Sequence, residues 1–220
     1  MVRSTMKSVV HRPQQQRSIA TYGRMLDAAE ALLQKKSFDA VSVKEIAHAA
    51  GVTTGAFYTR FPDKEALLGA LEDRLTTMML NYIGEATRPE RWAGVNLEEG
   101  MRRYCLGLVE IYMKTRGAGR ALVLRSHTDA GLKRRLRRLN VEGLPRVLSV
   151  VVAQPGVTHE RPELAVEIAL LAIRSMLRET VLFSEAWPGE AALAPDVLAA
   201  ELARLSVGYL GIRGRRVVRR

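Results

Sequence analysis

Several residues whose types could contact a nucleic acid lie between Ser42 and Arg60. Hydroxyl and cationic side chains hold phosphates, and the guanidinium of arginine forks to O6 and N7 of guanine. Threonine methyls and alanine meet the methyl group of thymine, and glycine lets a backbone come close. These residue types stand at Ser42, Lys44, Thr53, Thr54, Gly55, Ala56, Thr59 and Arg60. Whether these side chains contact DNA depends on the elements that carry them.

The sequence shows none of the residue patterns that are typical of an enzyme. It has no paired carboxylates, no Ser/His/Asp arrangement, no glycine-rich phosphate loop and no metal-ligand spacing. Cys105 is the only cysteine, which excludes a disulfide framework and a cysteine-based zinc site. The histidines are too dispersed to form a metal site, at His11, His48, His127 and His159. We predict no catalytic residues, no metal and no cofactor.

Three helices must position the candidate segment. Apolar residues at helical spacing predict a first helix over 18–36. Ser42 and Glu45 have the form of a capping box, which begins a second helix. Gly51 ends that helix because glycine accepts a positive φ, and a third helix follows over about 53–60.

The spacing of these breaks predicts a helix-turn-helix. The third helix ends before Pro62, and Asp63 caps a fourth helix over about 64–82. Two short helices that cross steeply need a small residue at the crossing, a glycine in the turn and an apolar plug in the second helix. Those positions hold Ala47, Gly51 and Phe57. On this spacing alone, a DNA-binding motif and an ordinary structural helix pair fit equally well.

A longer sequence pattern favours the DNA-binding motif. Residues 43–68 read VKEIAHAAGVTTGAFYTRFPDKEALL. This run closely resembles the DNA-binding domain of the TetR family of bacterial transcriptional regulators, with its Ile-Ala, Ala-Gly-Val, Gly, Tyr, Phe, Lys-Glu and Leu-Leu elements in order. The resemblance covers about 17–70. It implies that Tyr58 contacts a phosphate and that Lys64 is a phosphate clamp.

Each of these roles has an alternative that the sequence leaves open. Ser42 and Thr53 either contact phosphates or serve only as helix caps. Tyr58 either meets DNA or packs on the first helix, and Lys64 is either a clamp or a solvated surface lysine. Arg60 either reads a base or forms a salt bridge or phosphate contact.

Composition favours helices for the whole chain, because Leu, Ala and Arg dominate and aromatic residues make up only 5%. Further helices are predicted at 97–116, 119–127, 130–153, 161–185 and 191–211. We therefore predict an all-α fold of about nine helices, with an N-terminal three-helix DNA-binding domain and a larger helical ligand-binding and dimerisation domain. The predicted divisions are a flexible basic arm at 1–16, the helix-turn-helix domain at 17–65, the helical domain at 66–212 and a basic tail at 213–220.

The penultimate helix is apolar nearly all round between Leu164 and Leu177, so it must bury two sides. The resemblance implies that the last two helices form a four-helix homodimer interface. A central helix in a monomer is the alternative. A dimer would place two recognition helices on half-sites about 34–36 Å apart, so the predicted operator is a palindrome of double-stranded DNA.

One helical stripe is a candidate wall for a ligand pocket, although such a stripe also fits ordinary core. Its residues are Met101, Tyr104, Cys105, Leu108, Ile111 and Tyr112. Met176 and Phe183 are predicted to face it. The ligand-binding candidates are Tyr104, Leu108, Tyr112 and Met176, and Arg102 or Arg103 is a candidate partner for an anionic group.

The net charge of +11 first indicates an acidic partner. Only +3 of it falls in residues 1–80, whereas +8 falls in 81–220, with basic clusters at 133–138 and 213–220. The first cluster is either a solvated face or a source of nonspecific attraction to DNA or an anionic ligand. Bulk charge therefore does not mark the DNA-binding site.

The chain has no apolar run near the ~18 residues of a membrane span and no apolar signal segment, so we expect a cytoplasmic protein with no membrane partner. The expected function is that of a dimeric transcriptional regulator, a repressor released from its operator by a small-molecule inducer. A nonspecific or architectural DNA-binding protein is the alternative, and activation is also open. The sequence does not identify the ligand, the operator or the regulated genes.

Overall fold

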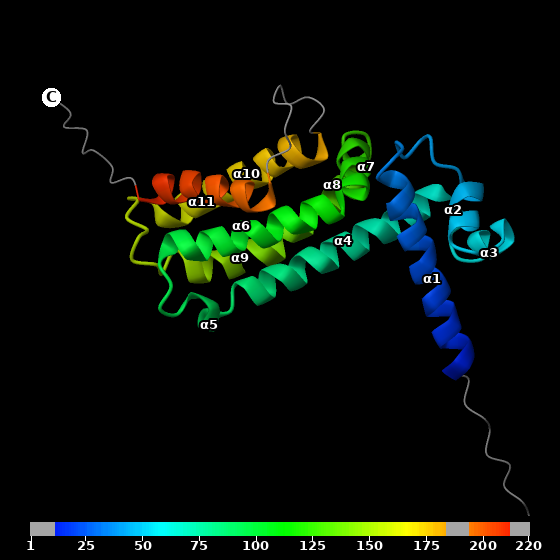
Figure 1. The fold of residues 1–220 in the computed structure, drawn as a ribbon, viewed down its shortest axis with the longest axis horizontal. Coiled ribbons are helices and arrows are strands. Elements are labelled where there is room, and N and C mark those ends of the chain that lie inside the picture. Colours follow the sequence, from blue (N-terminus) through cyan, green and yellow to red (C-terminus); the bar gives the residue numbers. More distant parts are fainter. Residues whose placement is uncertain (1–11, 184–193, 212–220) are drawn as a thin grey trace, which may run out of the picture. The chain divides into compact units, whose positions relative to one another are not determined.

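A computed structural model describes residues 12–183 and 194–211 of the chain (Figure 1). Within these residues the regular structure is helical and no strand occurs, which confirms the all-α prediction. The chain divides into two units between Ala70 and Leu71. None of the described helices has the length and apolar character that crossing a membrane requires.

The N-terminal unit contains α1 (Arg12–Leu33), α2 (Val43–Ala49), α3 (Thr54–Tyr58) and the beginning of α4 (Lys64–Ala86). Phe57 is fully buried, and its ring lies 5.3 Å from the ring of Phe61, measured between centroids. Ala47 is 1% exposed, as a helix crossing requires. Other buried residues of this core are Met25, Leu26, Ala29, Leu33, Ile46, Leu67 and Leu68. The core therefore uses the small residue and the apolar plug that the spacing predicts.

The first helix begins earlier than the sequence predicted. α1 starts at Arg12, not Ser18, and takes in residues 12–16 of the predicted flexible arm. Proline is tolerated in the first turn of a helix, and glutamine is a good helix former, so Pro13 and the glutamines after it extend α1. Residues 1–11 of the arm lie outside the described residues.

The larger unit continues α4 and adds helices of very different lengths. They are α5 (Pro89–Trp92), α6 (Leu97–Lys114), α7 (Arg116–Ser126), α8 (Ala130–Leu136), α9 (Arg138–Val151), α10 (Pro162–Leu177), the π-helical turn η1 (Arg178–Leu182) and α11 (Pro195–Leu210). α11 packs on both α6 and α10 (Figure 1). All of these elements except α7 and α8 contribute to one apolar core, in which Cys105, Ala165 and Leu177 are completely inaccessible to solvent.

Several predicted helix boundaries in this unit are wrong. The single helix at 130–153 is two, α8 and α9, which meet at Arg137. A continuous helix there would stack like charges four residues apart, Lys133 with Arg137 and Arg134 with Arg138, which is unfavourable. The predicted helix at 161–185 becomes α10 and η1. α5 and the extension of α4 to Ala86 were not predicted.

The last helix starts later than the predicted residue 191, and part of the predicted range lies outside the described residues. α11 begins at Pro195, where proline fits the first turn of a helix. Residues 184–193 and the predicted basic tail at 213–220 lie outside the described residues.

Two glycines allow α4 to lie close to its neighbours. A Cβ at Gly107 of α6 would collide with the ring of Tyr82, and a Cβ at Gly143 of α9 would lie 2.8 Å from Cδ1 of Ile83. Because no side chain intervenes, α6 and α9 approach α4 from two sides. This packing places α4, α6 and α9 around a common interior space.

Candidate nucleic-acid interface and ligand pocket

A capping box begins α2, as the sequence predicted. The Oγ of Ser42 accepts a hydrogen bond from the backbone N–H of Glu45 at 3.2 Å, and the Glu45 carboxylate accepts one from the Ser42 N–H at 2.8 Å. Lys36 donates to the same carboxylate. This bond from Lys36, followed by those from Ser42, lowers the pKa of Glu45 to about 2. The start of α2 is thus fixed by contacts from both sides.

A tight turn then leads into α3. Gly51 has a φ of +66°, which other residues adopt only with strain. Thr53 is the N-cap of α3, and its Oγ1 accepts a hydrogen bond from the backbone N–H of Ala56 at 3.1 Å. Ser42 and Thr53 therefore do act as caps, and both side chains remain exposed.

The outward face of α3 carries exposed polar and small residues. The Tyr58 side chain is 55% exposed, with its ring edge against Phe57 at 5.5 Å between centroids, so it does not pack into the core. Thr54, Gly55 and Thr59 are also exposed, and Lys44 is exposed on α2. The Thr59 hydroxyl donates to the Gly55 carbonyl at 2.9 Å. A surface of this kind can meet both phosphates and base edges.

Two predicted DNA contacts have other partners within the N-terminal unit. The Lys64 ammonium donates to the carbonyls of Phe38 at 2.8 Å and Val41 at 3.0 Å, and lies 4.5 Å from the centroid of the Phe38 ring. The Arg60 guanidinium donates to the Ala56 carbonyl at 3.2 Å and to the Ser18 hydroxyl at 3.5 Å. Lys64 is thus not a freely solvated lysine, and Arg60 is held against its own helix.

One contact that holds α2 in place could not be predicted from the sequence. The Nε of Arg24 on α1 donates to the carbonyl of Ala50, the C-cap of α2, at 3.2 Å. The partners are 26 residues apart, and no local pattern links them. The predicted DNA-binding residues nevertheless come together, at the start of α2, along α3 and at the start of α4.

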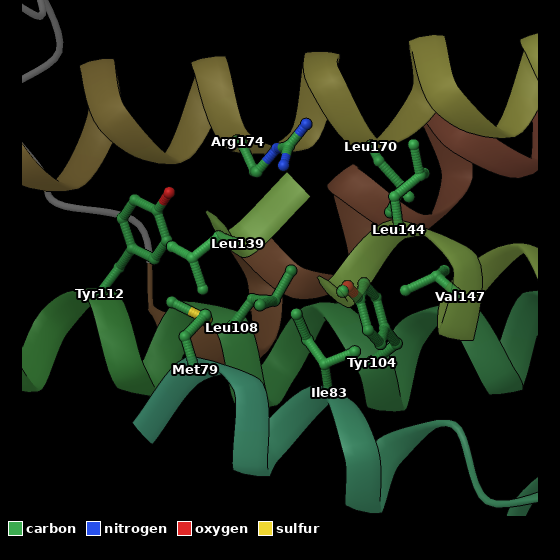
Figure 2. Close-up of a pocket in the computed structure, with 11 residues that line it drawn as sticks. Met79, Ile83, Tyr104, Leu108, Tyr112, Leu139, Leu144, Val147, Leu170 and Arg174 are labelled. Atoms are coloured by element: carbon green, nitrogen blue, oxygen red, sulfur yellow. The ribbon is translucent and has the colours of Figure 1, made fainter. Parts of the chain in front are cut away.

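A pocket in the larger unit brings together three of the four predicted ligand residues. Tyr104, Leu108 and Tyr112 of α6 line it, whereas Met176 does not (Figure 2). The other lining residues come from α4, α9 and α10, and they are Met79, Ile83, Leu139, Gly143, Leu144, Val147, Leu170 and Arg174. The pocket volume is about 60 Å³.

The arginines proposed from sequence for an anionic ligand are engaged elsewhere. Arg102 and Arg103 both pair with Glu99, at 2.8 and 2.7 Å, and these bonds lower the pKa of Glu99 to about 2. Burial raises the pKa of Cys105, next to the pocket tyrosine Tyr104, to about 12. Within the described residues no group of histidines, cysteines and carboxylates is arranged to hold a metal ion.

The match to a known family falls on the N-terminal unit. The family described as bacterial regulatory proteins, tetR family, matches residues 25–71. The N-terminal unit belongs to the TetR family. Its helix-turn-helix is the family's DNA-binding domain, and TetR-family members regulate transcription.

Two curated relatives agree with this assignment over part of their length. The TetC protein of transposon Tn10 in Escherichia coli is 38% identical over 74 residues, which are 34% of this chain and 38% of TetC. The HTH-type transcriptional regulator YvdT of Bacillus subtilis is 36% identical over 62 residues, 28% of this chain and 32% of YvdT. The match thus spans only about a third of the length of each of these relatives.

Solved TetR-family structures match nearly the whole fold. A TetR-family regulatory protein from Rhodococcus RHA1 has a TM-score of 0.66 at 22% identity, covering 88% of this chain and 98% of its own. NalD of Pseudomonas aeruginosa, described as the secondary repressor of the MexAB-OprM multidrug efflux pump, has a TM-score of 0.57 at 21% identity, covering 89% and 98%. Both structures are similar in fold to this chain over most of its length.

Proposed function

We propose that this chain is a dimeric TetR-family repressor that binds a palindromic operator through α3 and is released by a small-molecule inducer, without catalysis. The observation that carries the proposal is the exposed polar face of α3 on a capped and anchored α2–α3 pair. The pocket in the larger unit supports a response to a ligand. The repressor role also draws on NalD, which has the same fold.

The proposed DNA contacts are assigned first to the residues that are exposed to solvent. Thr54, Gly55 and Thr59 face outward on α3 and are placed to meet base edges, while Tyr58 and Lys44 reach phosphates. Ser42 and Thr53 contribute through the capped N-termini of α2 and α3. The half-buried Ala56, Arg60 and Lys64 complete the proposed set.

Selection of bound duplexes from a random pool tests specific DNA binding. We expect one enriched palindrome, bound about 10³-fold or more tightly than a scrambled duplex of equal length. Tyr58→Phe removes only the hydroxyl and should weaken binding to every duplex alike. Equal affinity for selected and scrambled duplexes would favour the nonspecific DNA-binding alternative instead.

Exposed apolar residues on the last two helices support a homodimer. Ile168 and Leu171 of α10 are 42% and 59% exposed, and Val197 and Leu205 of α11 are 44% and 58% exposed. Gly208 of α11 faces open space, with no atom within 4 Å of the Cβ it lacks. An apolar face that the unit itself leaves uncovered fits a second copy of the chain, and a glycine there permits close helix contact.

Light scattering of the purified chain tests this interface. We expect a dimer for the native chain and a monomer for Leu171→Glu, because the new charge would be buried without a partner. Leu124→Glu is the matched control, since Leu124 of α7 is 54% exposed but lies on another helix. If both variants stay dimeric, α10 is not the interface.

A further inference from the structure

One charged side chain stands out in the lining of the pocket. Arg174 is the only charged residue among the lining residues, and every other polar group there belongs to Tyr104 or Tyr112. Figure 2 shows Arg174 entering from α10, with the hydroxyl end of Tyr112 pointing toward that side of the pocket. The remaining wall is aliphatic apart from the thioether of Met79. The pocket thus has an apolar body and one polar corner.

Arg174 lacks a counter-charge of its own. Its Nη1 donates to the side-chain carbonyl of Asn140 on α9, a neutral partner. No carboxylate of the described residues pairs with it, in contrast to Arg102, Arg103 and Arg178. A half-buried guanidinium that faces an apolar space gains most from an anion that it can bind through two parallel hydrogen bonds.

The electrostatic effect of Arg174 reaches both tyrosines. Burial raises the pKa of Tyr104 and of Tyr112, and the positive charge of Arg174 opposes that rise at each phenol. Because the phenols stay protonated, they can donate hydrogen bonds to an anion but do not supply the missing negative charge.

The size of the space limits the ligand. A volume of about 60 Å³ is well below the ~300–1,000 Å³ of pockets that take drug-sized molecules. A single ring or a short alkyl chain matches the aliphatic wall, with its polar head at Arg174.

We propose that this pocket binds a small apolar monocarboxylate, aromatic or short-chain, with the carboxylate on Arg174 and the apolar body between α4, α6 and α9. This inference rests on the proposed function only in taking the larger unit as the sensor. It assigns the anionic contact to Arg174 and not to Arg102 or Arg103.

Calorimetric titration of the full chain with matched acids and alcohols tests the proposal. The probes are benzoate against benzyl alcohol and hexanoate against hexanol. We expect at least one acid to bind about tenfold or more tightly than its alcohol, since charged hydrogen bonds are the stronger ones. Arg174→Gln should remove this preference while leaving alcohol binding unchanged, and Arg174→Lys should restore part of it.

Arg102→Gln is the matched control, because Arg102 is a paired arginine on the same helix as both tyrosines. Its affinity for the acids should equal that of the native chain. The proposal is overturned if neither acid binds, if acid and alcohol bind equally, or if Arg174→Gln leaves acid binding intact. Circular dichroism of each variant verifies its fold.

A parallel DNA-binding assay separates this inference from the proposed function. If benzoate or hexanoate binds through Arg174 but does not release the selected operator, the pocket assignment stands and ligand-responsive repression fails. If other compounds release the operator while neither acid binds, the repressor proposal stands and the carboxylate assignment is wrong.

Discussion

At the scale of single residues, Lys64 has two uses that compete for the same N–H donors. A phosphate clamp needs free N–H donors, yet the Lys64 ammonium donates to the carbonyls of Phe38 and Val41 and covers the Phe38 ring. These contacts tie the start of α4 to the segment between α1 and α2. We therefore expect Lys64 to hold the start of α4 in place within the N-terminal unit. In the proposed DNA complex it also contacts a phosphate.

Replacing Lys64 separates the two uses. Lys64→Ala should lower the free energy of unfolding by about 1–2 kcal/mol through the lost charged hydrogen bonds. A lost phosphate contact would also reduce the slope of log affinity against log salt by about 0.9. Denaturant unfolding and salt titration of operator binding measure the two effects. Lys44→Ala, at an exposed site on α2, should change the slope without loss of stability.

At the scale of elements, the capping box of α2 predicts a pH dependence. The pKa of Glu45 is lowered from 4.5 to about 2, so its contribution to stability is fully present above about 4.5 and is lost as the pH falls toward 2. Glu45→Gln should therefore be less stable than the native chain near neutral pH, and the difference should shrink through this window. Denaturant melts of both proteins at several pH values measure it. A difference that does not change with pH would contradict the prediction.

An ion pair between α4 and α8 predicts a stability effect in the larger unit. Glu72 is 2% exposed, and its carboxylate accepts hydrogen bonds from Arg135 at 2.9 Å and from Thr76 at 3.3 Å. Arg135→Ala leaves that carboxylate buried without its cation. Since Arg135 is half exposed, we expect Arg135→Ala to lower the free energy of unfolding by about 2 kcal/mol, which is less than for a fully buried pair. Arg134→Ala, next in sequence and exposed, should cost less than about 0.5 kcal/mol in the same denaturant melts.

Local signals predicted the elements better than their ends. The capping box at Ser42 and Glu45 and the glycine turn at Gly51 are encoded within a few residues, so both were predicted. The junction of α8 and α9 at Arg137 was not, because helical periodicity continues across it.

Contacts between distant residues also escaped prediction. Two hydrogen bonds join residues that are 26 positions apart, Arg24 with Ala50 and Lys64 with Phe38. Such bonds form only once the chain has folded, so no local pattern predicts them. In the pocket, helical spacing along α6 was enough to predict Tyr104, Leu108 and Tyr112 as lining residues. Arg174 became a candidate only once α10 was packed beside α9.

At the scale of the whole molecule, most of the net charge of +11 lies outside residues 1–80, because +8 of it falls in residues 81–220. In the basic cluster at 133–138, Arg135 pairs with Glu72 and Arg138 pairs with Glu142. Each of these ion pairs has no net charge, so the surplus of +11 belongs to other cations. This distribution supports our proposal that recognition depends on the few residues of α3 more than on bulk charge.

Because Cys105 is buried, the rate at which a thiol reagent labels it reports how often the core around it opens. Cys105 is the only thiol in the sequence, it is inaccessible to solvent, and its raised pKa of about 12 suppresses the reactive thiolate. A thiol reagent such as Ellman's reagent can therefore act only when the core of the larger unit opens. We expect slow labelling of the native chain, faster labelling of Arg135→Ala, and further slowing by any compound that fills the neighbouring pocket. Labelling at the rate of a free thiol would contradict this expectation.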